Sequence, residues 1–151
     1  MQFEEQIVIA APPEKVFALY ENVTAWSSWD PDVKASSIEG SFSSGASGSL
    51  QPSSGPKARI KFTEVMPNRS FTVEAKLPLC VMRFEHELTS LPFGTSAKHR
   101  VTFQGLLSPF FGRVIGSQIR KVLPNTLRGL KHAAEQQIQY GVQAELPQKR
   151  G

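Results

Sequence analysis

Cysteine is nearly absent from this chain of 151 residues, which carries only Cys80. A single thiol excludes a disulfide within the chain and fits a reducing compartment, so we expect a cytoplasmic protein. Long apolar runs are also missing, because no stretch approaches the roughly 20 residues of a membrane span. The first 17 residues lack the basic start and the apolar run of a secretory signal peptide, which agrees with that expectation.

Clustered charge and recognisable cofactor loops are missing as well. The net charge is +4, but the cations are scattered, so we expect no nucleic-acid partner and at most weak contact with a membrane surface. Gly40, Gly45 and Gly48 form no phosphate-binding loop, because their spacing is wrong and no helix follows. We expect no cofactor.

The length and the 40% hydrophobic content predict one globular domain over 1–151, with an ordered core of about 2–140.

The apolar periodicity changes twice along the chain. It predicts, in order, a strand at 2–10, two short helices around Val16 and Trp26, strands near 34–40, 47–51, 57–65, 70–77, 79–90 and 95–105, and a helical segment from about 108 to 140. Pro124 should kink or divide that last segment. A run of strands followed by a helix favours an α+β fold, in which a curved antiparallel sheet packs against the helix. Such an arrangement generally leaves a cavity between them.

Two histidines lie on either side of the turn "LPFG". If position 90 pairs with 95, paired positions sum to 185, which predicts the pairs Met82–Phe103, Phe84–Val101, His86–His99 and Leu88–Ala97. A slip of one residue would place charged side chains in this apolar row. Directly opposed side chains are about 5 Å apart at Cβ. We therefore expect His86 and His99 to touch, on the face that points to the cavity or the helix.

Three roles for the histidine pair can be compared. Zinc requires three or four ligands, and Cys80 lies about 20 Å away along the strand, so we expect no metal site. An imidazole pair could act as acid and base or polarise a carbonyl, which makes His86 and His99 weak catalytic candidates. The interpretation that we favour is that both line a pocket and hydrogen-bond to each other, to water or to a ligand.

Other polar and aromatic side chains have plainer interpretations. Trp26 and Trp29 are favoured as anchors of the short helices against the sheet, with a stacking wall or gate of the cavity as the alternative. Asp30 and Asp32 lie in "WDPDV", where a proline-bounded loop without a metal-ligand pattern predicts turn residues.

Three segments together resemble one superfamily. "IAAPPEKVFALYENVTAWSSWDPDV", "FTEVMPNRSF" and "GTSAKHRVTFQGLLSPFFG" are similar to the START/Bet v 1-like superfamily, in particular its polyketide cyclase/dehydrase-like branch. The resemblance covers about 2–140 and implies a helix-grip fold, in which a seven-stranded antiparallel sheet grips the C-terminal helix around an apolar pocket. No shared catalytic signature transfers to this chain. Inward-facing residues should line the pocket: Phe62, Phe71, Val73, Met82, Phe84, His86, His99, Val101, Phe103, Ile119, Leu123 and Leu127.

These observations leave three functional hypotheses open. The first is a module that binds a small hydrophobic or amphipathic molecule such as a lipid, isoprenoid, polyketide or aromatic compound. The second is a cyclase or dehydratase that uses the histidines as acid and base. The third is an interaction protein whose pocket has collapsed. The sequence is compatible with a monomer or a homodimer.

Overall fold

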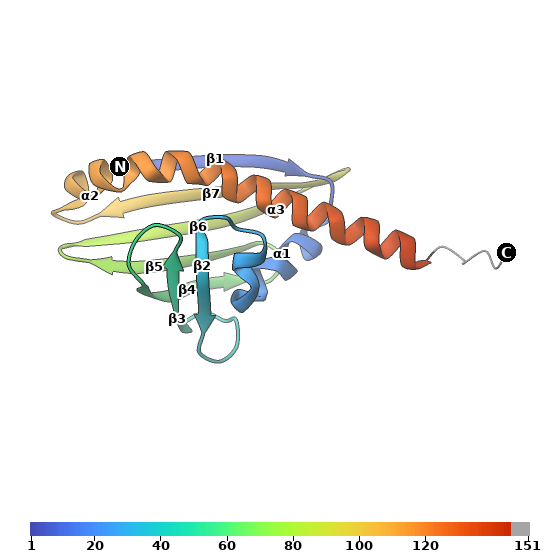
Figure 1. The fold of residues 1–151 in the computed structure, drawn as a ribbon, viewed down its shortest axis with the longest axis horizontal. Coiled ribbons are helices and arrows are strands. Elements are labelled where there is room, and N and C mark those ends of the chain that lie inside the picture. Colours follow the sequence, from blue (N-terminus) through green and yellow to red (C-terminus); the bar gives the residue numbers. More distant parts are fainter. Residues whose placement is uncertain (146–151) are drawn as a thin grey trace.

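The computed structural model describes the fold of residues 1–145 and the side chains of residues 1–136 (Figure 1). Its elements are β1 (Gln2–Ile9), α1 (Pro13–Glu21), the 3-10 helix η1 (Val23–Ser28), β2 (Val33–Ile38), β3 (Ser47–Pro52), β4 (Ala58–Met66), β5 (Ser70–Leu77), β6 (Cys80–Leu91), β7 (Gly94–Gln104), α2 (Ser108–Val114) and α3 (Gly116–Glu145). The α+β class and the predicted order of strands and helices are confirmed.

All seven strands form one antiparallel sheet in the order β1-β7-β6-β5-β4-β3-β2. The register of the β6–β7 hairpin is the predicted one, with Met82 opposite Phe103, Phe84 opposite Val101, His86 opposite His99 and Leu88 opposite Ala97. The alternation of inward apolar and outward polar residues fixes this register, because a slip would bury charges.

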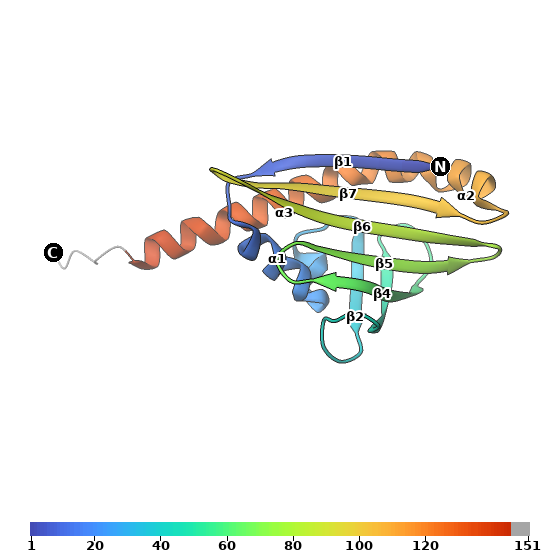
Figure 2. The same ribbon diagram turned by 180° about the vertical axis from the view of Figure 1, so that it is seen from behind.

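The helices close one face of the sheet. In Figure 1, α3 crosses in front of β7 and β6, whereas in the reverse view of Figure 2 the strands lie in front of α3. The segment formed by α1 and η1 connects β1 to β2, the two edge strands of the sheet. It packs against the same face as α3, so three helical elements surround the space above the sheet. No helix within residues 1–145 is long and apolar enough to cross a membrane.

The sequence predicted a kink or a division of the C-terminal helical segment at Pro124. The helix is not divided there: α3 runs through Pro124, and the break lies at Ile115, between α2 and α3. At this break Gly112 contacts Met1 and Gly116 contacts the ring of Phe3 so closely that neither glycine leaves room for a Cβ atom. The segment therefore turns where it meets the N-terminal strand. The predicted helical segment ends at about residue 140, and its side chains beyond residue 136 lie outside the described ones.

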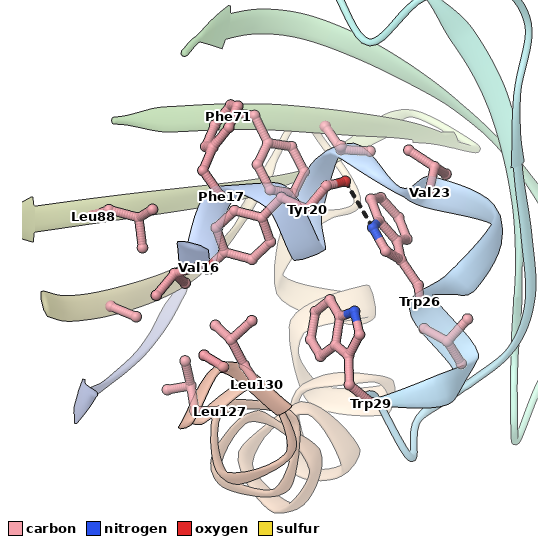
Figure 3. Close-up of a cluster of buried hydrophobic side chains, with 14 of the residues drawn as sticks. Val16, Phe17, Tyr20, Val23, Trp26, Trp29, Phe71, Leu88, Leu127 and Leu130 are labelled. Carbon is pink, nitrogen blue, oxygen red and sulfur yellow. Dashed lines mark hydrogen bonds between the residues drawn. The ribbon is translucent and has the colours of Figure 1, made fainter. Parts of the chain in front are cut away.

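The buried side chains form two clusters. The larger one joins α1 and η1 to the strands and to the middle of α3, and it includes Tyr20, Trp26, Phe71 and Leu130 (Figure 3). The smaller cluster joins β1, β6 and β7 to the start of α3, and it consists of Phe3, Cys80, Met82, Val101, Phe103, Ile119 and Leu123. Phe84 packs against both clusters. The core is therefore interrupted along the length of α3, and this is where the cavity lies.

Candidate ligand-binding cavity

A cavity of about 100 Å³ lies between the sheet, η1 and the first half of α3. Most of its wall is apolar, and the wall contains residues of both core clusters. The lining residues are Trp26, Trp29, Asp30, Asp32, Val33, Leu50, Ile60, Phe71, Val73, Phe84, Glu85, His86, His99, Arg100, Val101, Ile119, Val122, Leu123 and Thr126. An apolar cavity of about 150 Å³ holds a benzene molecule, so this smaller one holds at most one small ring or a short chain unless its wall moves.

The two histidines meet in the wall as the register requires. The rings of His86 and His99 are 4.6 Å apart between centroids and nearly perpendicular, at 72°. The imidazole of His86 also stacks on Phe71 of the neighbouring strand β5, at 3.9 Å and 5°. Its Nδ1 atom donates a hydrogen bond to the carbonyl oxygen of Phe71 at 3.2 Å, since a carbonyl can only accept. In the neutral ring, Nε2 of His86 is therefore an acceptor.

His99 is held by Tyr20 of α1. The Tyr20 hydroxyl and Nε2 of His99 are 2.8 Å apart, and both side chains are buried, with His99 only 4% exposed. A buried hydroxyl needs an acceptor for its proton, and the lone pair of His99 Nε2 supplies one. This assignment leaves the proton of neutral His99 on Nδ1. The pair then offers one acceptor, His86 Nε2, and one donor, His99 Nδ1–H.

Burial keeps both rings uncharged. Removal from water lowers the pKa of His86 to about 4, although its hydrogen bond to Phe71 opposes this shift. The pKa of His99 is also well below its ordinary value, because of burial and the neighbouring His86. Burial raises the pKa of Tyr20, so its hydroxyl stays protonated. At neutral pH the three groups form a polar but uncharged patch in an apolar wall.

A second polar group of side chains comes from the loop after η1. Asp30 Oδ1 accepts hydrogen bonds from the Thr126 hydroxyl of α3 at 2.8 Å and from the backbone N–H of Asp32 at 2.9 Å. Partial burial raises the pKa of Asp30, and these hydrogen bonds oppose the rise. Burial and the nearby charge of Asp30 raise the pKa of Asp32 to about 6. Both aspartates act as turn residues, as predicted, and both also border the cavity.

The two tryptophans serve as anchors and as cavity wall at once. Trp26 Nε1 donates to the backbone oxygen of Tyr20 at 2.9 Å, which joins η1 to α1 (Figure 3). Trp29 packs against α3, and its buried Nε1 has no hydrogen-bond partner among the described residues. Gly129 makes this packing possible, because a Cβ atom there would overlap the carbonyl oxygen of Trp29. The anchor and wall interpretations of these residues therefore coexist.

The predicted pocket residues divide according to their position along the strands. Eight line the cavity: Phe71, Val73, Phe84, His86, His99, Val101, Ile119 and Leu123. Four do not: Phe62, Met82, Phe103 and Leu127. Phe62 and Leu127 are buried inside the larger cluster, while Met82 and Phe103 fill the smaller cluster beyond one end of the cavity. The three strand residues face inward, as alternation requires, and Leu127 is buried from α3, but neighbouring side chains cover all four.

Several lining residues were absent from the sequence-based set. Trp26, Trp29, Asp30 and Asp32 come from η1 and its following loop, and Thr126 comes from the polar edge of α3. The signal for the first four was the concentration of aromatic and acidic side chains in "WSSWDPD". Glu85 and Arg100 also border the cavity, but they alternate with the inward residues and form an ion pair at 3.4 Å.

Comparisons with solved structures agree with this architecture. The di-domain aromatase/cyclase StfQ from the steffimycin biosynthetic pathway superposes with a TM-score of 0.75 at 15% identity, over 91% of this chain and 51% of that one. The chain therefore spans about half of that protein's length. Ara h 8.0201 gives a TM-score of 0.68 at 15% identity, over 90% of this chain and 98% of that one. NE0264 from Nitrosomonas europaea gives 0.73 at 15% identity, over 93% and 97%.

These likenesses establish the fold and nothing more, because all three sequence identities are low. No curated protein sequence matches the chain significantly. A family model described as "Polyketide cyclase / dehydrase and lipid transport" matches residues 1–135, which is most of the chain. The helix-grip architecture, the cavity between sheet and helix, and this match lead to one conclusion: the chain belongs to the polyketide cyclase/dehydrase and lipid transport family.

Proposed function

We propose that the cavity binds a small, mainly apolar molecule whose one polar group meets the histidine pair. The observation that carries this proposal is the contact between His86 and His99, each with one ring nitrogen engaged by a hydrogen bond, in a wall that is otherwise mostly apolar. Burial of hydrocarbon supplies affinity at about 25 cal/mol per Å², whereas an uncharged polar patch orients the ligand. A hydroxyl or carbonyl group of the ligand fits this patch better than a charged group, because neither histidine carries a charge that would balance the charge of the ligand.

Binding is better supported than acid–base catalysis. A general acid or base works best when its pKa lies near the working pH. The pKa of His86 is about 4, and that of His99 is well below its ordinary value, so neither neutral ring readily takes up a second proton at neutral pH. The cyclase or dehydratase alternative would require the ligand to raise these pKa values after it binds. The family description, which joins lipid transport with cyclase activity, accommodates either role.

The cavity also limits the size of the ligand. About 100 Å³ accommodates a single ring or a short branched chain, and a long lipid would have to displace side chains from the wall. Val122 on α3 lines the cavity and is only half-buried, so it can tolerate a larger side chain. The substitution Val122→Phe would occupy cavity volume. Val114→Phe is a matched control, because Val114 is 61% exposed on α2 and does not line the cavity.

Native mass spectrometry of the purified protein tests the proposal. We expect the wild-type chain and Val114→Phe to carry an additional small mass that organic extraction releases. Val122→Phe should carry much less of it. If the wild-type chain has only the mass of the polypeptide under gentle ionisation, or if Val122→Phe retains the same adduct, the proposal is wrong.

A further inference from the structure

Apolar side chains are exposed together at one end of the molecule. The β5–β6 turn contributes Leu79, and the segment that leads through α2 contributes Leu106, Leu107, Phe110 and Val114. Their exposed fractions range from 36% at Leu107 to 82% at Leu106. The backbone N–H of Leu107 donates to the oxygen of Leu79 at 3.1 Å, so the two segments lie side by side (Figures 1 and 2). We call these five residues the apolar end.

The chain segment that contains most of the apolar end carries charge of one sign. Positions 88–134 contain no aspartate or glutamate, although they contain seven lysines and arginines. Arg113 projects from α2 beside Phe110 and Val114, and Arg120 and Lys121 are exposed on the first turns of α3. The guanidinium of Arg120 lies 5.2 Å from the ring centre of Phe3, close to the break between α2 and α3. Exposed apolar side chains are therefore flanked by cations that have no carboxylates near them in the sequence.

We propose that the apolar end docks on an anionic lipid bilayer. A bilayer surface accepts apolar side chains at the level of the headgroups and attracts nearby lysines and arginines to its phosphates. Leu106 and Phe110 enter the boundary between headgroups and acyl chains, while Arg113, Arg120 and Lys121 contact the phosphates. A soluble protein partner would need acidic residues over the same area, but only a bilayer also takes up isolated leucine and phenylalanine side chains without shape complementarity.

The docked end is connected to the cavity through α3. Its first turns carry the cations Arg120 and Lys121, and the interleaved residues Ile119, Val122 and Leu123 line the cavity. Docking would therefore place the cavity wall within a few helical turns of the lipid. The inference goes beyond the proposed function and does not depend on it, because the surface would bind vesicles whether or not the cavity holds a ligand.

Co-sedimentation with phospholipid vesicles tests the docking. We expect the wild-type chain to bind vesicles of phosphatidylcholine with phosphatidylglycerol, and to bind pure phosphatidylcholine much more weakly. The double variant Leu106→Glu/Phe110→Glu should lose at least tenfold in affinity, since two anchors are replaced by like charges. The control is Phe93→Glu, because Phe93 is 74% exposed in the β6–β7 turn at the other end of the molecule and should leave binding unchanged.

The electrostatic part has its own variants. Arg113→Glu and Lys121→Glu should each weaken binding by about fivefold or more, whereas Lys34→Glu on the exposed edge strand β2 should not. Binding should also fall as salt rises from about 0.1 M to about 1 M, because screening shortens the reach of the charges.

Two results would overturn the docking proposal. One is equal binding of Leu106→Glu/Phe110→Glu and the wild-type chain to anionic vesicles. The other is failure of the wild-type chain to bind them while sedimentation equilibrium shows a dimer that the same double variant dissociates, which would assign the apolar end to a second copy of this chain.

Discussion

At the scale of single residues, the histidine pair is defined by the hydrogen bonds of its two rings and by the lowering of their pKa values through burial. The carbonyl of Phe71 fixes one ring and the hydroxyl of Tyr20 fixes the other, so each ring has one nitrogen engaged. The sequence predicted the contact between His86 and His99 through strand register alone. It could not predict Tyr20 as the partner, because Tyr20 lies 79 positions from His99 and reaches it only through the packing of α1 on the sheet.

The same burial predicts how stability depends on pH. The pKa of His86 is about 4 in the folded protein and near 6.5 in the unfolded chain, so the unfolded chain binds more protons between these values. The contribution of His86 is therefore fully present above about pH 6.5 and is lost as the pH falls toward 4, at about 1.4 kcal/mol per pH unit. His99 acts in the same direction, because its pKa is also lowered.

Asp32 opposes the loss of stability that the two histidines cause on acidification, and its substitution tests this assignment. Its pKa is raised to about 6 in the folded protein, so the folded state binds more protons than the unfolded state as the pH passes from 6 toward 3.8. Acidification in that range favours folding at this site. We expect Asp32→Asn to lose stability more steeply than the wild-type chain between pH 6 and 4, as measured by urea unfolding. Parallel curves for the two proteins would contradict the assignment.

At the scale of elements, the contact between α3 and the loop after η1 holds the cavity closed on one side. Trp29 and Asp30 in the loop meet Thr126 on the helix, and Gly129 allows the loop and the helix to approach. The sequence predicted both helices but not this contact, since a glycine within a helix pattern gives no indication of what packs against it. It also predicted a kink or a division at Pro124, whereas the helix is continuous there and the break lies at Ile115, where the chain meets β1.

The substitution Gly129→Ala tests this contact. Alanine favours a helix over glycine by about 1 kcal/mol, but its Cβ would overlap the rigid carbonyl of Trp29. We expect a net loss of about 1–2 kcal/mol in the free energy of unfolding, because such overpacking costs up to about 3 kcal/mol. Gln118→Ala, at an exposed position of the same helix, should change stability by less than about 0.5 kcal/mol. A stabilised Gly129→Ala protein would show that α3 and the loop after η1 do not approach so closely.

At the scale of the whole molecule, the inward face of the sheet is longer than the cavity. Alternation predicts which side chains face inward, and this was sufficient to place Phe71, Phe84 and Val101 in the cavity wall. Alternation does not predict which inward side chains are covered by others. Met82 and Phe103 were expected in the cavity wall for this reason, but they pack inside the smaller core cluster. That distinction depends on how β1 and the start of α3 pack around these side chains, and only the assembled fold determines it.

The two tryptophans allow the central claim to be measured directly. Trp26 and Trp29 are the only tryptophans of the chain, and both line the cavity. A 1H–15N correlation NMR spectrum of the chain therefore contains two indole N–H signals, and each reports on the cavity. The measurement is a titration with para-cresol, an apolar ring with one hydroxyl, carried out on the wild-type chain, on Val122→Phe and on Val114→Phe.

The account predicts that at least the Trp29 indole signal shifts saturably in the wild-type chain and in Val114→Phe, and that the shift is lost or much reduced in Val122→Phe. If neither indole signal responds, or if Val122→Phe responds as the wild-type chain does, the cavity between the sheet, η1 and α3 is not the ligand site.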